Sequence, residues 1–346
     1  MTPQRILFIG GTGIISASCV REAVAQGHEV HCLNRGASTL RPLHPEVTLH
    51  TADARDREAV AGIVRAGEFD AVVQFVGFVP EHVEADIEAM AGHVGQYVFI
   101  SSASAYQTPV TRLPVTESTP LRNPHWQYSR DKIACEETLL RAYRDHGFPV
   151  TIVRPSHTYD ETMLPFDGGW TVVDRMRAGK EVVVPGDGTS LWTITHHSDF
   201  ARGFVGLLGR VDTVGEAFHI TSDQAPTWNE IYEAIAAAAG VTPRLVHVPS
   251  TYIAAVDAEW GAALLGDKSH SMVFDNSKIR SIVPGFRATV PFRDGAREMV
   301  AWHDAHPEHQ RVDPRWDGLM DRLADTFRPP AAAASPTAPH HEENLT

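Results

Sequence analysis

Short apolar runs recur along the first half of the chain, and stretches with helical spacing of apolar positions separate several of them. Each run covers four to six residues, a pattern typical of strands that are buried on both faces of a parallel sheet. The predicted strands lie at 5–9, 28–33, 47–50, 71–76, 97–100 and 150–155, and those at 28–33 and 47–50 mix polar with apolar residues. Strands that alternate with helices predict βαβ units, and therefore an α/β fold built on a Rossmann-like, doubly wound parallel sheet.

A glycine-rich turn follows the first strand directly and opens the first predicted helix. The sequence of residues 10–16 is Gly-Gly-Thr-Gly-Ile-Ile-Ser. Strand, glycine turn and helix in this order are the context that a dinucleotide phosphate site requires, because the glycines let the backbone approach the pyrophosphate. The small Ser16 takes the place of the usual third glycine. An ordinary glycine turn is the alternative, but the flanking elements favour a nucleotide site.

The end of the second strand bears on the choice of cofactor. An acidic residue there binds the ribose 2′-hydroxyl of NAD, whereas an arginine meets the 2′-phosphate of NADP. The chain has Asn34 and Arg35 at this point, which favours NADP. Arg35 could equally stack on adenine or face water. After the third strand, Asp53 could accept a hydrogen bond from the adenine amino group.

Tyr128 and Lys132 stand four positions apart in a predicted helix. At this spacing both side chains point from one face of the helix. A nearby ammonium group favours the phenolate and would lower the pKa of the tyrosine, which makes it a better proton acceptor. Taken alone, the pair could be a half-buried tyrosine beside a solvated lysine.

With the strand-end motif Ser101-Ser102-Ala103-Ser104-Ala105-Tyr106 added, residues 1–305 resemble the extended short-chain dehydrogenase/reductase superfamily, in its nucleotide-sugar epimerase/dehydratase group. The resemblance implies that Ser102 hydrogen-bonds the reacting hydroxyl and that Tyr128 removes its proton. It also implies that Lys132 holds the nicotinamide ribose. Tyr128 follows Ser102 by 26 positions, a spacing that fits the family.

The chain departs from the family pattern at three places. Ala103 and Ser104 replace the Asp-Glu pair of the 4,6-dehydratases, which argues against sugar 4,6-dehydration. The segment between the fourth and fifth strands is short. Trp192 stands where the family has an arginine that binds the substrate diphosphate. Either that cation comes from Lys268, Lys278 or Arg280, or the substrate carries less phosphate.

The predicted site residues follow from these motifs. We expect catalysis by Ser102, Tyr128 and Lys132. We expect cofactor contacts from Gly10, Gly11, Thr12, Gly13, Ile14, Ile15, Asn34, Arg35, Asp53, Ala54, Val76, Gly77, Lys132 and Ser156. We expect substrate contacts from Ser102, Ser104, His157, Trp192, Lys268 and Lys278, although His157 could equally be a satisfied buried histidine.

Length and pattern predict two lobes and a tail. The dinucleotide-binding domain is expected to comprise residues 1–155 with segments near 195–221. The smaller, C-terminal substrate-binding lobe is expected to comprise residues 156–194 and 222–310. Residues 328–346 are rich in proline and alanine and then polar, which predicts a disordered tail.

Composition and net charge limit the classes of binding partner that we expect. The net charge of −13 disfavours nucleic acid and anionic membranes, and no stretch is apolar enough to span a bilayer. Three scattered cysteines indicate reduced thiols and a cytoplasmic protein. The His196-His197 pair and the histidines at 306 and 309 lack further ligands at zinc spacing, so no metal is expected. By resemblance, helices around Ala59–Val64 and Lys132–Tyr143 imply a homodimer.

The resemblance implies an NAD(P)-dependent epimerase that inverts C4 of a nucleotide-activated sugar through a transient keto-sugar, with the cofactor tightly bound throughout. The alternative is an NADPH-dependent keto-sugar reductase or dehydrogenase whose cofactor exchanges at every turnover, which Arg35 favours. A non-catalytic, RNA-binding relative is a third hypothesis. The acidic charge and the complete set of Ser102, Tyr128 and Lys132 argue against it.

Overall fold

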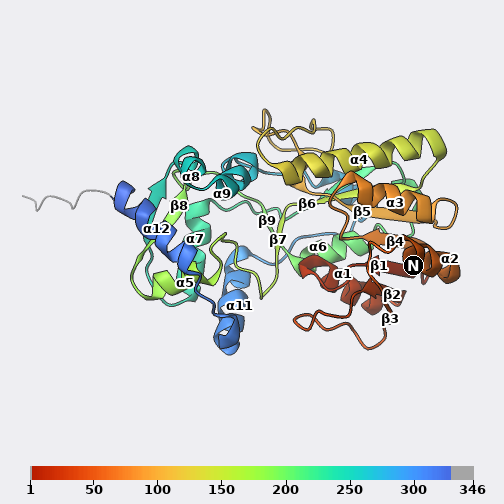
Figure 1. The fold of residues 1–346 in the computed structure, drawn as a ribbon, viewed down its shortest axis with the longest axis horizontal. Helices are drawn as coiled ribbons and strands as arrows, with labels where there is room; N and C mark the ends of the chain where they lie inside the picture. The colour runs from red at the N-terminus through yellow and green to blue at the C-terminus, as the bar shows by residue number, and fades with distance from the viewer. Residues whose placement is uncertain (1, 329–346) are drawn as a thin grey trace, which may run out of the picture.

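The computed structural model describes residues 2–328, and a seven-stranded parallel sheet forms the centre of its larger lobe (Figure 1). The strand order is β10-β6-β5-β4-β1-β2-β3. The strands are β1 (Arg5–Ile9), β2 (Glu29–Asn34), β3 (Thr48–Thr51), β4 (Ala71–Gln74), β5 (Gln96–Ile100), β6 (Val150–Pro155) and β10 (Ala217–Ile220). The predicted α/β class and doubly wound sheet are therefore confirmed. Most of the predicted tail, residues 329–346, lies outside the described residues.

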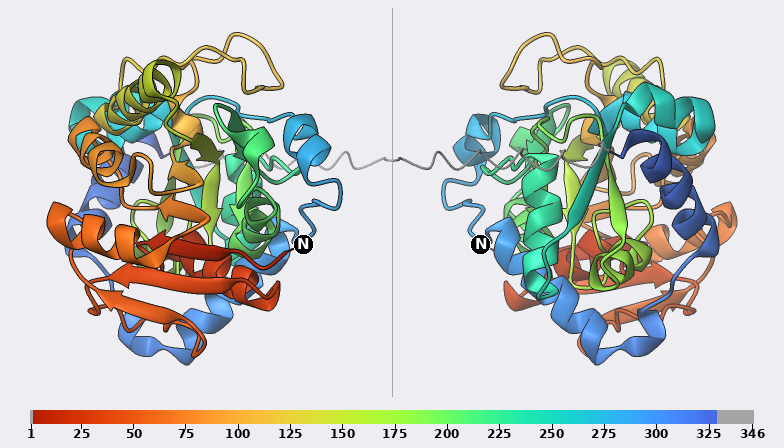
Figure 2. Two further views of the ribbon diagram at one scale, coloured as in Figure 1. Left: turned by 90° about the vertical axis from the view of Figure 1, so that its right-hand side faces the viewer. Right: turned by 90° about the vertical axis from the view of Figure 1, so that its left-hand side faces the viewer.

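Helices cover both faces of this sheet, as Figure 2 shows. Successive residues of β1 point to opposite faces, so Ile6 and Phe8 join one core while Leu7 and Ile9 join the other. The first core packs against α1 (Ile14–Ala25) and α6 (His197–Val205). The second core packs against α2 (Arg57–Gly67), α3 (Pro80–Met90) and α4 (Gln127–His146). Burial on both faces explains why the inner strands β1, β4 and β5 are apolar at consecutive positions, whereas the edge strand β3 is largely exposed.

The smaller lobe has a separate apolar core around two parallel strands, β8 (Glu181–Pro185) and β11 (Arg244–Val248). The helices of the smaller lobe are α5 (Trp170–Arg177), α7 (Trp228–Ala238), α8 (Ser250–Val256), α9 (Ala258–Ala263), α11 (Phe292–Ala305) and α12 (Pro314–Phe327). Helix α10 (Ser277–Ile282) lies within the range predicted for this lobe, but its Ile279 packs into the core of the larger lobe. Helix α12 lies beyond the predicted boundary at residue 310, yet its buried leucines belong to this core.

The chain passes between the two lobes several times. It leaves the sheet after β6 and forms β7 (His157–Tyr159), which pairs with β9 (Ile194–His196) between the lobes (Figure 1). It returns to the sheet for α6 and β10 and leaves again for α7. Among the described residues, no helix has the length and apolarity needed to cross a membrane. The three cysteines are buried and free, as the sequence indicates.

A buried ion pair fixes α4 to the sheet. The Arg154 guanidinium on β6 donates to both carboxylate oxygens of Glu136 on α4, with Nη2 at 2.5 Å from Oε2 and Nε at 2.9 Å from Oε1. The two side chains are 5% and 1% exposed. The guanidinium also stacks 4.8 Å from the ring centroid of Tyr106. Since α4 carries Tyr128 and Lys132, this pair helps to set where both side chains lie.

We expect Arg154→Leu to lower the free energy of unfolding by about 3–5 kcal/mol, because it leaves the Glu136 carboxylate buried without a partner. Urea unfolding followed by circular dichroism measures the change. Arg57→Leu is the matched control, since it breaks the exposed Arg57–Glu88 pair and should cost less than about 1 kcal/mol. Equal losses in the two variants would contradict the role given to the buried pair.

Candidate active site

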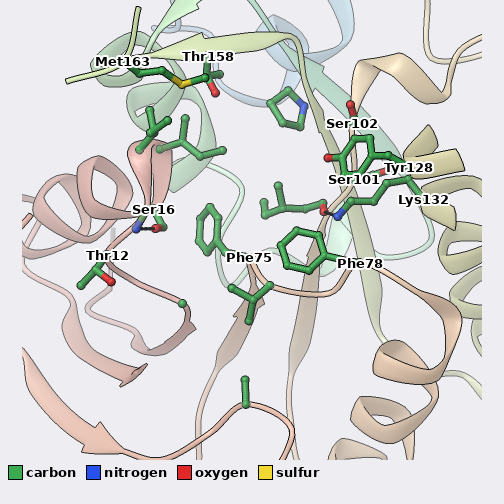
Figure 3. Close-up of a pocket in the computed structure, with 18 of the residues that line it drawn as sticks. Thr12, Ser16, Phe75, Phe78, Ser101, Ser102, Tyr128, Lys132, Thr158 and Met163 are labelled. Carbon is green, nitrogen blue, oxygen red and sulfur yellow. Dashed lines mark hydrogen bonds between the residues drawn. The ribbon is translucent and has the colours of Figure 1, made fainter. Parts of the chain in front are cut away.

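A cavity of about 1100 Å³ lies where the carboxyl ends of the central strands meet the smaller lobe (Figure 3). Its lining begins at the glycine turn after β1 and continues through the ends of β2, β4, β5 and β6. The smaller lobe contributes residues from both sides of β7 and from the segment around residue 267. Ligands of doubly wound sheets bind at this edge.

The glycine turn has the geometry of a phosphate cradle. Gly10 has a φ of +89°, and a Cβ at that position would lie 2.7 Å from a Val76 methyl group. A Cβ at Gly11 would lie 2.5 Å from the Cys32 sulfur. The Gly13 amide donates to Ser16 Oγ at 2.7 Å, a contact drawn in Figure 3. The turn therefore accepts only glycine at its start and leaves the backbone open to a ligand.

Asn34, at the end of β2, stabilises this turn through a hydrogen bond. Its Oδ1 accepts a hydrogen bond from the Gly11 amide at 2.9 Å. Its Nδ2 is buried and has no hydrogen-bond partner among the described residues. A buried donor without a partner is costly, so an acceptor on a bound ligand would satisfy it. This observation, together with the open turn, fits the dinucleotide that the sequence predicts.

The far end of the cavity is lined by Arg35, Asp53, Ala54 and Arg55. Asp53 Oδ1 accepts from the Arg55 amide at 2.9 Å. The Arg55 guanidinium reaches across to the carbonyl oxygen of Val76. We did not single out Arg55 from the sequence, where it appears only as a neighbour of Asp53. Its position in the cavity adds a second arginine beside Arg35.

Other predicted cofactor residues also line the cavity, including Thr12, Ile14, Ile15 and Ser156. Ser156 Oγ lies 2.7 Å from Thr195 Oγ1 on β9. Gly77 does not line the cavity itself, but its carbonyl oxygen accepts a hydrogen bond from Lys132 Nζ at 2.6 Å. The second acceptor of Lys132 Nζ is the carbonyl oxygen of Ile100, at 2.8 Å. The lysine thus joins α4 to the chain after β4 and at the end of β5.

The structure corrects the expected effect of Lys132 on Tyr128. Burial raises the pKa of the Tyr128 phenol, the nearby Asp267 carboxyl raises it further, and hydrogen bonding with Ser102 only partly opposes this. Lys132 Nζ lies 5.8 Å from the centroid of the tyrosine ring and points at backbone carbonyls. Burial also lowers the pKa of Lys132 to about 8. At neutral pH the tyrosine is therefore a protonated phenol.

Ser102 is held in place by two further hydroxyl groups. Ser102 Oγ lies 2.9 Å from Ser104 Oγ, and Ser129 on α4 donates to Ser104 Oγ at 2.7 Å. Ser102 and Tyr128 lie side by side in Figure 3. Ser104 also lines the cavity, so its predicted contact with substrate stays a prediction beside its contact with Ser102. Ser101 Oγ is buried without a partner among the described residues.

Trp192, His157 and Asp267 line the part of the cavity where the sequence predicts the substrate, which we call the substrate side. Trp192 is stacked between His157 and Trp228, with ring centroids 4.3 Å and 4.5 Å away. His157 Nε2 is buried without a partner within residues 2–328, and burial lowers the pKa of this histidine to about 3. The imidazole is therefore neutral. The free nitrogen favours the role of a polar cavity wall over that of a satisfied core histidine.

Two predicted substrate residues do not reach the cavity. Lys268 Nζ is paired with Asp167 at 2.8 Å, and Lys278 Nζ with Glu216 at 2.5 Å. Neither lysine is part of the lining. Arg280, the third cation considered, is paired with Asp223 at 2.5 Å. Their carboxylate partners come from distant parts of the chain, so the sequence alone could not reveal that these cations are already engaged.

A loop of the larger lobe is clamped to the smaller lobe over the cofactor half of the cavity. Arg41 Nε lies 2.5 Å from Asp160 Oδ2, and the guanidinium also contacts the Thr162 hydroxyl. The two charged side chains are 15% and 4% exposed. Ser38 and Leu43, on either side of Arg41, line the cavity. We call the Arg41–Asp160 pair the loop clamp.

Comparison with known proteins agrees with this geometry. The model of the NAD dependent epimerase/dehydratase family matches residues 6–221. The 2′-dehydrokanamycin reductase of Streptomyces kanamyceticus is 29% identical over 296 residues, which span 82% of this chain and 80% of the reductase. The chloroplast stem-loop binding protein of 41 kDa b of Arabidopsis thaliana is 30% identical over 258 residues, which span 70% of this chain and 66% of that protein.

Solved structures share the fold. The UDP-glucose 4-epimerase of Thermus thermophilus, whose structure is a complex with NAD, aligns with a TM-score of 0.68. The alignment covers 87% of this chain and 99% of the epimerase, at 21% sequence identity. At this identity the likeness establishes the shared fold alone.

The burial of Lys132 predicts a pH-dependent stability. Its pKa is about 8 in the folded state against an ordinary 10.5, so between these values the unfolded state binds more protons and stability rises with pH. Lys132→Met removes this contribution. The unfolding free energy of the wild type minus that of Lys132→Met should therefore increase by about 2 kcal/mol from pH 7.5 to 9.5, because only the wild type gains stability from this group. Urea unfolding at both pH values measures it.

Lys180→Met, which removes a half-exposed lysine, is the control for the loss of an ammonium group. If the wild type and Lys132→Met keep the same difference at both pH values, the pKa of Lys132 is not lowered.

Proposed function

The chain belongs to the NAD dependent epimerase/dehydratase family, and on this basis we propose that it is an NAD(P)-dependent reductase of a keto group on a sugar-like substrate. One observation carries the proposal: Ser102 and a protonated Tyr128 face the same cavity as the glycine turn. A phenol at neutral pH is equipped to give a proton to a carbonyl oxygen. The reverse reaction, oxidation of a hydroxyl, uses the same groups.

The cofactor supplies or accepts the hydride when it is bound. The glycine turn and the N-terminus of α1 would hold its pyrophosphate, and Asn34 Nδ2 would donate to it. Arg35 and Arg55 favour the additional phosphate of NADP. The ammonium group of Lys132, fixed by two carbonyl oxygens, would orient the nicotinamide ribose.

The residues around the substrate carbonyl have separate tasks. Ser102 donates a hydrogen bond to the carbonyl oxygen and so orients it. As hydride reaches the carbonyl carbon, Tyr128 transfers its proton to that oxygen, and the product is a secondary alcohol. Because the pKa of Tyr128 is not lowered but raised above its ordinary value, its resting form is the phenol, which is the form that reduction consumes. Ser104 and Ser129 keep Ser102 in position through their hydroxyl contacts.

The substrate side of the cavity supports a reductase over an enzyme of nucleoside diphosphates. Among the described residues that line this side, none is a lysine or arginine other than Lys132, which the backbone already engages. Lys268, Lys278 and Arg280 are paired elsewhere. A diphosphate would therefore lack a cation. The relative from Streptomyces kanamyceticus is likewise named a reductase.

Epimerisation at C4 of a nucleotide-activated sugar is the second candidate. It uses the same first half-reaction, after which hydride and proton return to the other face of the keto-sugar. The loop clamp favours it, because a buried ion pair across the cofactor half would slow cofactor exchange. An epimerase has no need to exchange its cofactor, whereas a reductase must release it at every turnover.

Two further expectations concern partners. A homodimer through the helices around Ala59–Val64 and Lys132–Tyr143 stays a prediction. The absence of nucleic-acid binding also stays a prediction, supported by the net charge of −13, although one relative is named a stem-loop binding protein.

Tyr128→Phe should lower kcat at least about 100-fold, because it removes the proton donor, while the Kd for NADPH changes little. NADPH consumption with a panel of methyl oxo-glycosides that differ in carbonyl position measures kcat, and fluorescence titration measures Kd. Tyr143→Phe is the control, since Tyr143 is an exposed tyrosine on the same helix. Full activity in Tyr128→Phe would overturn the proposed mechanism.

The nucleotide content of the purified protein separates the two candidates. Denatured protein is analysed by mass and by absorbance in the reduced-nicotinamide band. A reductase should contain little nucleotide and bind NADPH reversibly, whereas near-stoichiometric oxidised cofactor would favour the epimerase. In either case Arg41→Ala should increase the rate of cofactor release about tenfold or more, because the loop clamp is lost. An unchanged release rate would show that the clamp does not retain the cofactor.

A further inference from the structure

The substrate side of the cavity contains one carboxyl group among the described residues, that of Asp267. This residue lies in a single π-helical turn, η3 (Leu264–Lys268), which follows α9 in the smaller lobe. The negative charge of Asp267 raises the pKa of Tyr128. Asp267 therefore lies close to the phenol that would face the reacting carbon. The motifs at the glycine turn and on α4 give no role to this aspartate.

The turn that carries Asp267 is held firmly against the larger lobe. Asn123, just ahead of α4, donates through Nδ2 to the carbonyl oxygen of Gly266 at 2.6 Å and to that of Ser104 at 3.0 Å. A Cβ at Gly266 would lie 2.7 Å from Trp126 Cβ. One amide group thus links the strand-end motif and the turn. The position of Asp267 relative to Ser102 is set by this contact.

The carboxyl group of Asp267 lacks a direct ion-pair contact, although Lys268 lies near enough for its positive charge to lower the pKa of the carboxyl. The Trp192 indole lies near enough to lower the pKa of this carboxyl, and the rings of His157 and Trp228 contact the indole from either side. Lys268, the adjacent cation, is paired with Asp167 instead. Within residues 2–328, no cationic side chain forms an ion pair with Asp267. Burial accordingly raises the pKa of this carboxyl to about 6.

A carboxylate that is partly removed from water and forms no ion pair is unfavourable, and a cationic group on a ligand would offset this cost. A phosphate or carboxylate on the ligand would instead be repelled. His157 Nε2, the unpartnered and neutral group beside Trp192 in the described part of the chain, suits a hydroxyl. The combination of one anion, one neutral polar nitrogen and aromatic rings matches a polyhydroxylated ring that bears an ammonium group.

We infer that Asp267 binds the ammonium group of an amino-sugar substrate, and that it thereby selects amino sugars over neutral sugars and over sugar phosphates. This inference rests on the proposed function, since it specifies the substrate of the same site. It assigns Asp267 to specificity. The proton chemistry remains with Tyr128.

Equilibrium binding tests the inference without requiring turnover. The probes are methyl 2-, 3-, 4- and 6-amino-deoxyglucopyranosides, each compared with methyl glucopyranoside by calorimetry at pH 7 with saturating NADP. At this pH the Asp267 carboxyl is mostly ionised and the amines are charged. At least one amino sugar should bind about tenfold or more tightly than the neutral sugar. Equal or undetectable binding of all amino sugars would overturn the inference.

Variants identify the group that is responsible. Asp267→Asn keeps the shape and the hydrogen-bonding capacity but removes the charge, so the preference for the amine should disappear. Asp267→Glu keeps the charge and should retain part of the preference. Asp187→Asn is the matched control: Asp187 is exposed, bonds Thr189 in its own loop and does not line the cavity. Its loss should leave the preference intact. A preference that survives in Asp267→Asn would overturn the inference.

Two controls keep the outcomes separate. A thermal melt and NADP binding show that each variant is folded. NADPH oxidation with the corresponding oxo-sugars is measured in parallel. Selective binding of an amine without any turnover would contradict the proposed reductase but not the role of Asp267. Turnover of neutral oxo-sugars without amine preference would support the reductase and overturn the role of Asp267.

Discussion

The burial of the Lys132 ammonium is the constraint on which the arrangement of the site depends. Its two backbone acceptors lie after β4 and at the end of β5, so one charged group fixes α4 against two neighbouring strands. The Arg154–Glu136 pair fixes the same helix further along. With the helix fixed at two points, Tyr128 has little freedom relative to the sheet edge. Precise placement of a catalytic group accounts for a large part of an enzyme's rate acceleration, and the two buried charges would provide it for Tyr128 under the proposed function.

The electrostatics of the cavity divide it into two halves. Arginines gather at the far, cofactor end, whereas the substrate side holds one unpaired carboxyl group and a neutral histidine among the described residues. The division suits a phosphate-rich cofactor and a substrate without phosphate. It also explains why the phenol of Tyr128 stays protonated, because burial and a neighbouring anion both oppose the phenolate. Under the proposed function, the negative potential that disfavours a second phosphate would also favour a tyrosine that donates its proton.

The sequence predicted the parts of this site that depend on local order along the chain. Apolar runs located the strands because both faces of the sheet are buried, and helical periodicity put Tyr128 and Lys132 on one face. Contacts between distant segments could not be predicted in this way. Asp267 lies at the cavity on a turn that Asn123 binds from the larger lobe, and Lys268 pairs with Asp167, 101 positions away in the sequence. The pKa of Tyr128 was misjudged for the same reason, since burial is a property of the assembled lobes.

The repeated passage of the chain between the sheet and the smaller lobe limits how such a protein can change over time. Because β7, β9 and the segments that flank them are interleaved with α6 and β10, the smaller lobe is not one continuous piece of sequence. Recombination between related genes would exchange only fragments of it, and each fragment would meet an unmatched core. New specificities in this architecture should therefore accumulate by single substitutions on the cavity wall, at positions such as 157, 192 and 267, while the lobe as a whole is inherited intact.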